Sequence, residues 1–395
     1  MLLWTELRYT GSVDNNILNG ALYLVGGGDP LLSIANLFSL AEDLKNKGVT
    51  KINGNFYYDD SKLIRLEKIN YLQADEFPYN SSVSALSVEF NRFNMFWKTK
   101  DGETTSYAVP NFAYDKLTLA EQQQNDDFIY QGSDIWIVSD QLKKRGRKTL
   151  PIKNPALLTA QLFKFYANLL GIEVAQPKYK IAPTTLKLLA THQSPELAQI
   201  VRLNMNYSNN LVSELLLLST ANKLAGRPVD SIAAAIAIVK NWYKQHIPSI
   251  NWSKINWQNG SGLSAKTTIT PEQMLHILRF ADSKQYNDHG FFTYLPASGI
   301  RGTLKKRFTR PELALRIWAK TGTMYFVNSL SGYMFTDDGK KYLFVIFIND
   351  KHKRRLIDSE LTVDRYNSLT GQAGAWGGRA LNLQQDILYK WINNY

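Results

Sequence analysis

Hydrophobic and polar positions alternate in short runs through the first 150 residues. The runs end at glycine, proline, asparagine or aspartate, a pattern typical of β-strands bounded by turns. The clearest runs are residues 21–25, 54–58, 107–110 and 134–138. A helical period occurs over residues 31–46. This part of the chain is therefore predicted to be mostly β.

The pattern changes after a basic segment, residues 143–148, which is predicted to be a surface linker. Asn154 followed by Pro155 predicts a helix start, because asparagine caps helices and proline suits their first position. Apolar residues then repeat with helical spacing until Leu169, and Gly171 predicts the end. Further helices are predicted at residues 205–224 and 229–245.

The last third of the chain predicts three successive strands and a final helix. The strands are residues 315–321, 329–335 and 342–347, and the amphipathic helix covers residues 381–391. Helices followed by an antiparallel meander and a closing helix indicate an α+β domain at residues 151–395. Residues 1–150 would form a separate, mostly β part.

Composition limits the chemistry. The chain has 395 residues and no cysteine, which excludes disulfides and thiolate catalysis. Its five histidines are scattered without a metal-binding spacing, so no metal or other cofactor is expected. The net charge of +12 favours polyanionic partners, namely nucleic acid, anionic lipid or cell-wall polymer. No apolar run is long enough to predict a membrane span.

Two short motifs suggest serine chemistry. Ser208-Asn209-Asn210 fits the S-x-N pattern and Lys320-Thr321-Gly322-Thr323 contains K-T-G. Such patterns occur together in penicillin-recognising serine enzymes. Each has a simpler interpretation: Ser208 as a helix N-cap, and Gly322 as a turn glycine at a strand edge. The third motif of these enzymes, S-x-x-K, is absent, because no serine in the sequence has a lysine three residues later.

Several phrases in a fixed order make the resemblance specific. The sequence resembles the D-alanyl-D-alanine carboxypeptidase/endopeptidase family of class C low-molecular-mass penicillin-binding proteins, the S13 peptidases, from about residue 18 onward. The phrases are residues 24–30, 59–61, 84–88, 154–157, 208–210, 260–264, 319–323 and 331–333.

The resemblance implies a β-lactamase/transpeptidase-like α+β domain interrupted by a large, mostly β insertion. Residues 1–150 would be the insertion and residues 151–395 the resumed catalytic domain. The nucleophile motif and the export signal would then belong upstream of this sequence, so we expect the chain to be truncated at its amino terminus. We expect a periplasmic or other extracytoplasmic location.

The resemblance also implies roles for individual residues. Ser208 would relay a proton, Asn210 would hold the acyl-side amide, and Lys320 would tune Ser208. The hydroxyls of Thr321 and Thr323 would bind the substrate carboxylate beside Gly322, and the Thr323 N–H would donate to the oxyanion. The implied partners are peptidoglycan stem peptides and β-lactams.

Three departures from the family pattern bear on substrate preference. Asn209 stands where an acidic residue is usual, Asn259 stands where aspartate is usual, and Arg301 stands where an acidic residue is common. A class A β-lactamase shares the motifs, but the long segment before Ser208 and the Gly-Gly-Gly-Asp-Pro phrase argue against it. A non-catalytic peptidoglycan-binding relative remains the alternative to a peptidase.

Three basic clusters, at residues 143–148, 305–307 and 351–355, raise the question of nucleic acid. No aromatic-interleaved RNA-binding motif accompanies them. We therefore interpret them as solvated surface and expect no nucleic-acid partner.

Overall fold

Two compact units make up the chain. The computed structural model describes residues 2–101, 103–110, 117–120, 128–132, 135–139, 145–286, 288–359 and 363–394. The first unit comprises Met1–Glu196 and Asn209–Ala235, and the second comprises Leu197–Ser208 and Ile236–Tyr395. The separate prediction of a domain division at residue 150 stays a prediction.

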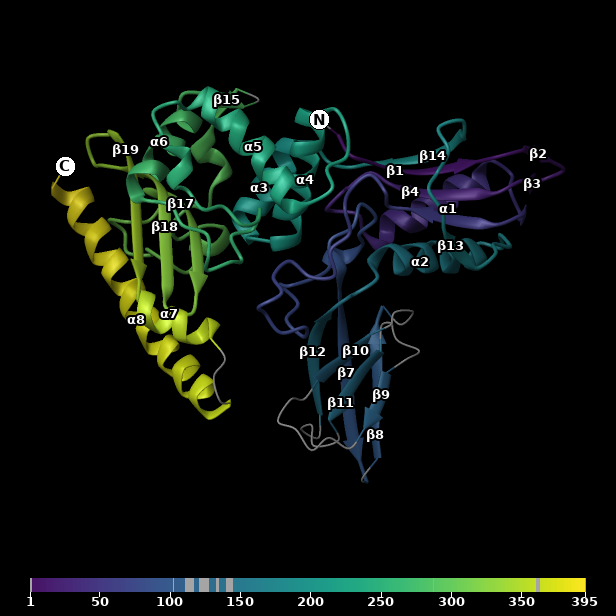
Figure 1. Cartoon of the computed structure of the whole chain (residues 1–395), viewed down its shortest axis with the longest axis horizontal. Helices are drawn as coiled ribbons and strands as arrows, with labels where there is room; N and C mark the ends of the chain where they lie inside the picture. Colours follow the sequence, from purple (N-terminus) through teal and green to yellow (C-terminus); the bar gives the residue numbers. More distant parts are fainter. Residues whose placement is uncertain are drawn as a thin grey trace. The chain divides into compact units, whose positions relative to one another are not determined.

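A five-stranded sheet forms the centre of the first unit, with strand order β13-β6-β4-β1-β14. Its strands are β1 (Trp4–Tyr9), β4 (Leu22–Gly26), β6 (Phe56–Asp59), β13 (Pro177–Tyr179) and β14 (Lys187–Gln193). Strand β1 is antiparallel to both neighbours, whereas β4, β6 and β13 are parallel. Helices α1 (Ile34–Asn46) and α2 (Pro155–Leu169) lie side by side below this sheet (Figure 1).

Both helices begin as the sequence predicts. The Asn154 side chain accepts a hydrogen bond from the Leu157 N–H at 3.3 Å, and Pro155 is the first residue of α2. In α1, Ser33 and Asn36 form a reciprocal capping box. The packed sides of the helices and the sheet share one core, which includes the fully buried Leu24 and Phe163.

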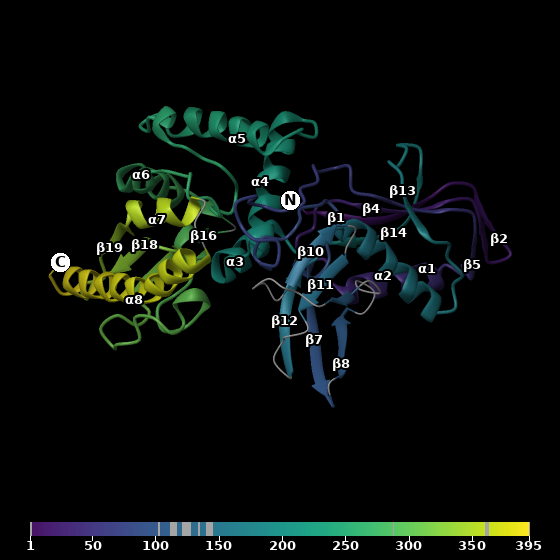
Figure 2. The same ribbon diagram turned by 60° about the horizontal axis from the view of Figure 1, so that its bottom comes forward.

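Smaller sheets complete the first unit. One contains β2 (Ser12–Asp14), β3 (Ile17–Asn19) and β5 (Lys51–Asn53); a second contains β10 (Phe128–Gly132), β11 (Ile135–Ser139) and β9 (Leu117–Ala120); a third contains β12 (Arg145–Pro151), β7 (Arg92–Lys100) and β8 (Glu103–Val109). The third is seen with its strands side by side in Figure 2.

The prediction of a linker at residues 143–148 was wrong from Arg145 onward. This stretch is part of β12 and pairs with β7 along its whole length, from Arg145 opposite Lys98 to Pro151 opposite Arg92. The strand was not predicted because basic side chains on its solvent-facing side interrupt the alternation of apolar and polar residues. They do not interrupt the backbone hydrogen bonds between β12 and β7. Residues 143 and 144 lie outside the described residues.

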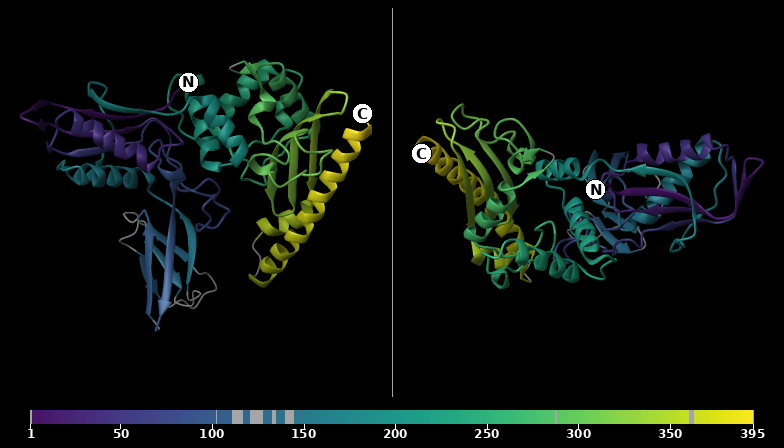
Figure 3. Two further views of the ribbon diagram at one scale, coloured as in Figure 1. Left: turned by 180° about the vertical axis from the view of Figure 1, so that it is seen from behind. Right: turned by 90° about the horizontal axis from the view of Figure 1, so that it is seen from above.

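The second unit contains the predicted antiparallel meander: β17 (Ile317–Met324), β18 (Val327–Phe335) and β19 (Lys341–Asn349). Helix α8 (Val363–Asn394) lies along one face, where Leu388 packs with Met334 and Phe344. Helix α6 (Pro271–Asp282) covers the other face through Leu278 and Tyr333. Both views in Figure 3 show α8 running along the sheet. The smaller elements are α3 (Leu197–Tyr207), α7 (Lys351–Asp358), β15 (Gln285–Tyr286), β16 (His289–Gly290) and most of α5 (Ile232–His246), whose first four residues belong to the first unit.

Two helix predictions required correction. The helix predicted at residues 205–224 is two helices, α3 and α4 (Asn210–Ala225), separated at Ser208. The final helix is longer than predicted, because its first half contains four glycines that weaken the amphipathic pattern. Within the part of the chain that the structure describes, no helix is long and apolar enough to span a membrane.

Candidate active site

Ser208 lies at the point where α3 stops. Its N–H still donates to the Asn204 carbonyl at 2.8 Å, but its φ of +55° is left-handed and ends the helix. The N-cap of the following helix is Asn209, whose side chain accepts from the Val212 N–H at 3.3 Å. The interpretation of Ser208 as an N-cap was therefore wrong. A non-glycine residue held in this strained conformation, with its hydroxyl not used by the helix, is typical of functional sites.

Lys320 lies on β17 and contacts Ser208 directly. Its Nζ donates to the Ser208 Oγ at 2.7 Å and to the Thr321 carbonyl at 2.7 Å. Burial lowers the pKa of Lys320 from 10.5 to about 8. The pKa of the amine is therefore close to neutral pH, so both its protonated and its neutral form are accessible. A proton can pass between the amine and the Ser208 hydroxyl along their hydrogen bond.

The lowered pKa of Lys320 predicts a pH-dependent stability. The unfolded chain holds this proton up to pH about 10.5, whereas the folded protein loses it near pH 8, so the free energy of unfolding rises with pH between these values. After allowance for partial exposure, the rise is worth about 1–2 kcal/mol. Urea unfolding of the wild type and of Lys320→Met at pH 7 and pH 10 should show the wild type gaining this much relative to the variant. If the free energies of unfolding of the two proteins differ by the same amount at pH 7 and pH 10, Lys320 is not the group that titrates in this range.

Thr303 is a site residue that the sequence analysis missed. Its Oγ1 lies 3.0 Å from the Thr321 Oγ1, so two hydroxyls stand together beside Lys320. Thr303 follows Gly302, which has a φ of +63° and lies against Asn206 of α3. A Cβ at Gly302 would be 2.6 Å from the Asn206 Oδ1 and 2.9 Å from its carbonyl oxygen. In the sequence, the run Gly302-Thr303-Leu304 is the signal that could have pointed to this residue, but the run by itself predicts no role for it.

Gly322 and Thr323 continue β17 past the lysine. A Cβ at Gly322 would be 2.4 Å from the Ser329 Oγ, so the absent side chain makes room for the Ser329 hydroxyl on the neighbouring strand. Thr323 is exposed and pairs with Asn328 across the sheet. The Asn328 Oδ1 in turn accepts from the buried Gln384 amide at 2.9 Å, which fixes this end of the sheet to α8.

Asn210 belongs to the first unit, where it is the first residue of α4. Its Nδ2 donates to the Tyr79 carbonyl at 2.8 Å. The second unit thus brings together Ser208, Lys320 and Thr321, whereas the contact of Asn210 is with a loop of its own unit.

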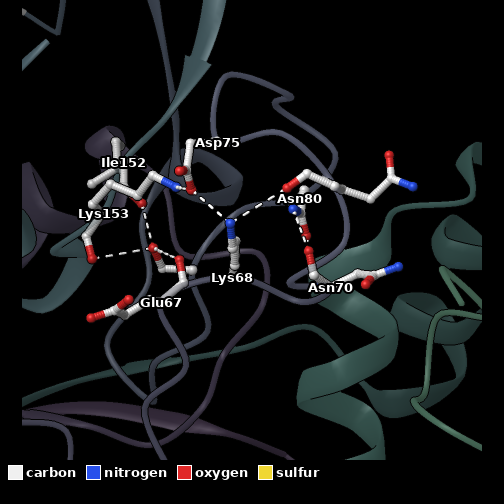
Figure 4. Close-up of polar contacts among 9 residues, drawn as sticks. Glu67, Lys68, Asn70, Asp75, Asn80, Ile152 and Lys153 are labelled. Atoms are coloured by element: carbon white, nitrogen blue, oxygen red, sulfur yellow. Dashed lines mark hydrogen bonds and ion pairs between the residues drawn. The ribbon is translucent and has the colours of Figure 1, made fainter. Parts of the chain in front are cut away.

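That loop is held by a polar network, drawn in Figure 4. Lys68 and Lys153 donate to the Asp75 Oδ1 at 3.1 and 2.8 Å, and the Asn70 N–H donates to the Asn80 Oδ1 at 2.8 Å. Burial by itself would raise the pKa of Asp75, but the hydrogen bonds and charges of the two lysines hold it below its ordinary value. The carboxylate stays ionised and anchors the segment that presents the Tyr79 carbonyl to α4.

The described ranges contain no group of three or more histidine, cysteine, aspartate or glutamate side chains that could hold a metal ion. The chemical groups brought together at the site are hydroxyls and one amine with a lowered pKa. Such a set suits proton relay and carboxylate binding.

Comparison with known proteins gives consistent matches. The model of the D-Ala-D-Ala carboxypeptidase 3 (S13) family matches residues 2–367. The D-alanyl-D-alanine carboxypeptidase DacB of Haemophilus influenzae is 26% identical over 366 residues, covering 87% of this chain and 75% of the relative. Penicillin-sensitive carboxypeptidase A of Dictyostelium discoideum is 29% identical over 209 residues, covering 51% of this chain and 39% of the relative.

Among solved structures, penicillin binding protein 4 (dacB) of Haemophilus influenzae matches with a TM-score of 0.78 at 23% identity. The match covers 96% of this chain and 86% of that one. It confirms the predicted α+β fold class.

Proposed function

Because the chain belongs to the D-Ala-D-Ala carboxypeptidase 3 (S13) family, a family of hydrolases, we propose that it acts in serine-type D-Ala-D-Ala carboxypeptidase chemistry on peptidoglycan stem peptides. The substrate would be a peptide that ends in two D-alanines. β-Lactam binding, an endopeptidase activity at the same type of bond, and a periplasmic location are parts of this proposal.

The observation that carries the proposal is the 2.7 Å hydrogen bond between the Lys320 Nζ and the Ser208 Oγ. In the reaction, a serine attacks the peptide carbonyl and the leaving D-alanine takes up a proton before water releases the acyl group. Ser208 and Lys320 would deliver that proton, because the lysine pKa of about 8 makes the transfer inexpensive near neutral pH.

Substrate would be held by the groups around this pair. The positive charge of Lys320 and the hydroxyls of Thr321 and Thr323 would bind the terminal carboxylate, with Thr303 orienting the Thr321 hydroxyl. The resemblance of the S-x-N motif further assigns the Asn210 amide, which belongs to the first unit, to the acyl-side amide of the peptide. The Thr323 N–H would donate to the oxyanion that forms during attack.

A second function is favoured by a different observation. None of the serines in the 395-residue sequence has a lysine three residues later, so the sequence does not contain the family's nucleophile motif. Loss of a nucleophile typically reduces turnover by several powers of ten while leaving ligand binding in place. On this interpretation, the polypeptide binds D-Ala-D-Ala peptides without hydrolysing them.

One set of measurements separates the two functions. Diacetyl-L-lysyl-D-Ala-D-Ala and its L-Ala-L-Ala isomer are titrated calorimetrically, D-alanine release is followed enzymatically, and intact mass is recorded after incubation with penicillin. Selective binding of the D,D-peptide without D-alanine release and without a mass increase would indicate the binding function. Release of D-alanine together with a covalent penicillin adduct would establish the peptidase. The nucleophile would then be a serine that is not part of an S-x-x-K motif. Equal or no binding of the two isomers would contradict both functions.

A further inference from the structure

The sheet β12-β7-β8 has one buried and one open face. Along β7, Phe93, Met95 and Trp97 are buried, whereas the alternate residues between them point the other way. On the neighbouring strands, the residues paired with Phe96 and Lys98 are exposed. We call the open side the basic–aromatic face, defined by Phe96, Lys98, Tyr107, Arg145 and Arg147.

An aromatic platform occupies the middle of the basic–aromatic face. Phe96 and Tyr107 stand opposite each other on adjacent strands and stack with ring centroids 5.1 Å apart and planes 12° apart. Tyr107 is 59% exposed, so the platform is open to solvent. The Arg147 guanidinium lies 5.7 Å from the Phe96 centroid, and its Nε donates to the Asn94 Oδ1 at 3.1 Å. The arginine is thus oriented beside the rings rather than free to move.

The positive charges of this face are not balanced within the structure. Among the residues that the structure describes, Lys98, Arg145 and Arg147 form no ion pair. On the other side of β12, Lys148 does form one, with Glu76 at 3.1 Å. Arg145 also stands directly opposite Lys98 in the ladder, and like charges in that relation destabilise a sheet. An anionic ligand would relieve this repulsion.

We propose that the basic–aromatic face binds peptidoglycan, in the form of glycan strands that carry peptide carboxylates. Sugar rings present a C–H face that packs on flat aromatic surfaces such as the Phe96–Tyr107 platform. Guanidinium groups bind carboxylates through paired hydrogen bonds. Arg147 lies opposite Phe96 in the ladder, and Arg145 lies two residues away on the same strand, opposite Lys98. The choice of peptidoglycan over another anionic polymer rests on the proposed function.

The test uses the whole chain and co-sedimentation with purified, acid-treated sacculi, from which other anionic polymers have been removed. The variants are Tyr107→Ser, Arg147→Gln, and the pair Lys98→Gln with Arg145→Gln. The matched control is Lys45→Gln with Lys47→Gln, which removes the same charge from exposed positions near the end of α1. Thermal unfolding checks that each variant folds. Calorimetry with diacetyl-L-lysyl-D-Ala-D-Ala measures separately the affinity of the candidate active site for the soluble peptide.

We expect each face variant to weaken sacculus binding about tenfold, with the control and the binding of the soluble peptide unchanged. Added salt should lower sacculus binding of the wild type more than that of the Lys98/Arg145 variant. Face variants that sediment like the wild type would overturn the proposal. So would a wild type that binds single-stranded DNA more tightly than sacculi and loses it through the same substitutions, since the partner would then be a nucleic acid. A wild type that does not bind the soluble peptide would contradict the proposed function. That result alone would not contradict sacculus binding by the basic–aromatic face.

Discussion

Lys320→Met is expected to weaken binding of diacetyl-L-lysyl-D-Ala-D-Ala about 30- to 100-fold at pH 7. The ammonium group is the cation at the site that contacts Ser208, and burial lowers its pKa, so the charge is only partly hydrated before a ligand arrives. A charge-assisted hydrogen bond to a ligand carboxylate in such a place is worth about 2–2.7 kcal/mol, which corresponds to this loss of affinity. Isothermal titration of the wild type and the variant measures it.

The matched control is Lys340→Met, on the β18–β19 hairpin of the same unit. Lys340 is 63% exposed and pairs with Asp338 at 2.7 Å, so its loss changes the net charge equally without touching the site. We expect its affinity to stay within twofold of the wild type. An effect of Lys320→Met below threefold, or an equal effect of both substitutions, would show that Lys320 does not bind the carboxylate.

The affinity of the wild type should also fall as the pH rises through 8. The ligand carboxylate is ionised throughout this range, whereas Lys320 loses its charge near its pKa of about 8. The pH dependence should therefore be absent in Lys320→Met, which removes the titrating group. A pH profile that is the same for both proteins would assign the titration to another residue.

The sequence predicted the elements whose signals are local. Strand β4, helix α2 with its Asn154 cap, and the three strands β17, β18 and β19 lie within a few residues of their predicted bounds. Period, capping residue and turn residues are properties of adjacent positions, so they can be recognised without knowledge of the fold. The break at Ser208 could not be recognised in this way, because the left-handed turn lies within a continuous helical pattern.

Contacts between distant segments were only partly predictable. The motif pattern alone placed Ser208 and Lys320 in one site, because motifs that occur as a pair imply a shared site. Thr303 has no pattern of its own and became recognisable only from its 3.0 Å contact with Thr321. The open face of β12 was not predicted, because the residues that form it were assigned to another kind of structure. Its charges suggested a linker, and only pairing with β7 shows which side chains face solvent.

Gly302→Ala is expected to have the largest effect on stability, lowering the free energy of unfolding by about 2–4 kcal/mol. Gly302 has a φ of +63°, which costs a residue with a Cβ about 1–2 kcal/mol. The new Cβ would also meet the Asn206 carbonyl oxygen at 2.9 Å, and backbone cannot rotate away as a side-chain tip can. Either η5 (Gly302–Leu304) or the end of α3 must shift.

Gly339→Ala isolates the packing component of that loss. Gly339 has a φ of +79° and no atom within 4 Å of its absent Cβ, so only the backbone conformation is penalised, by about 1 kcal/mol. Urea unfolding of the two variants should therefore differ by about 1–3 kcal/mol. Equal losses would show that Gly302 does not hold η5 against α3.

The same substitution should weaken binding of the D-Ala-D-Ala peptide, because a shift of η5 moves Thr303 away from Thr321. Thr303→Val separates this effect from the loss of stability, since valine keeps the shape of threonine and removes only its hydroxyl. We expect Thr303→Val to unfold within about 1 kcal/mol of the wild type and to bind the peptide about three- to tenfold more weakly. Normal peptide binding by both variants would mean that Thr303 supports the fold and does not orient the Thr321 hydroxyl.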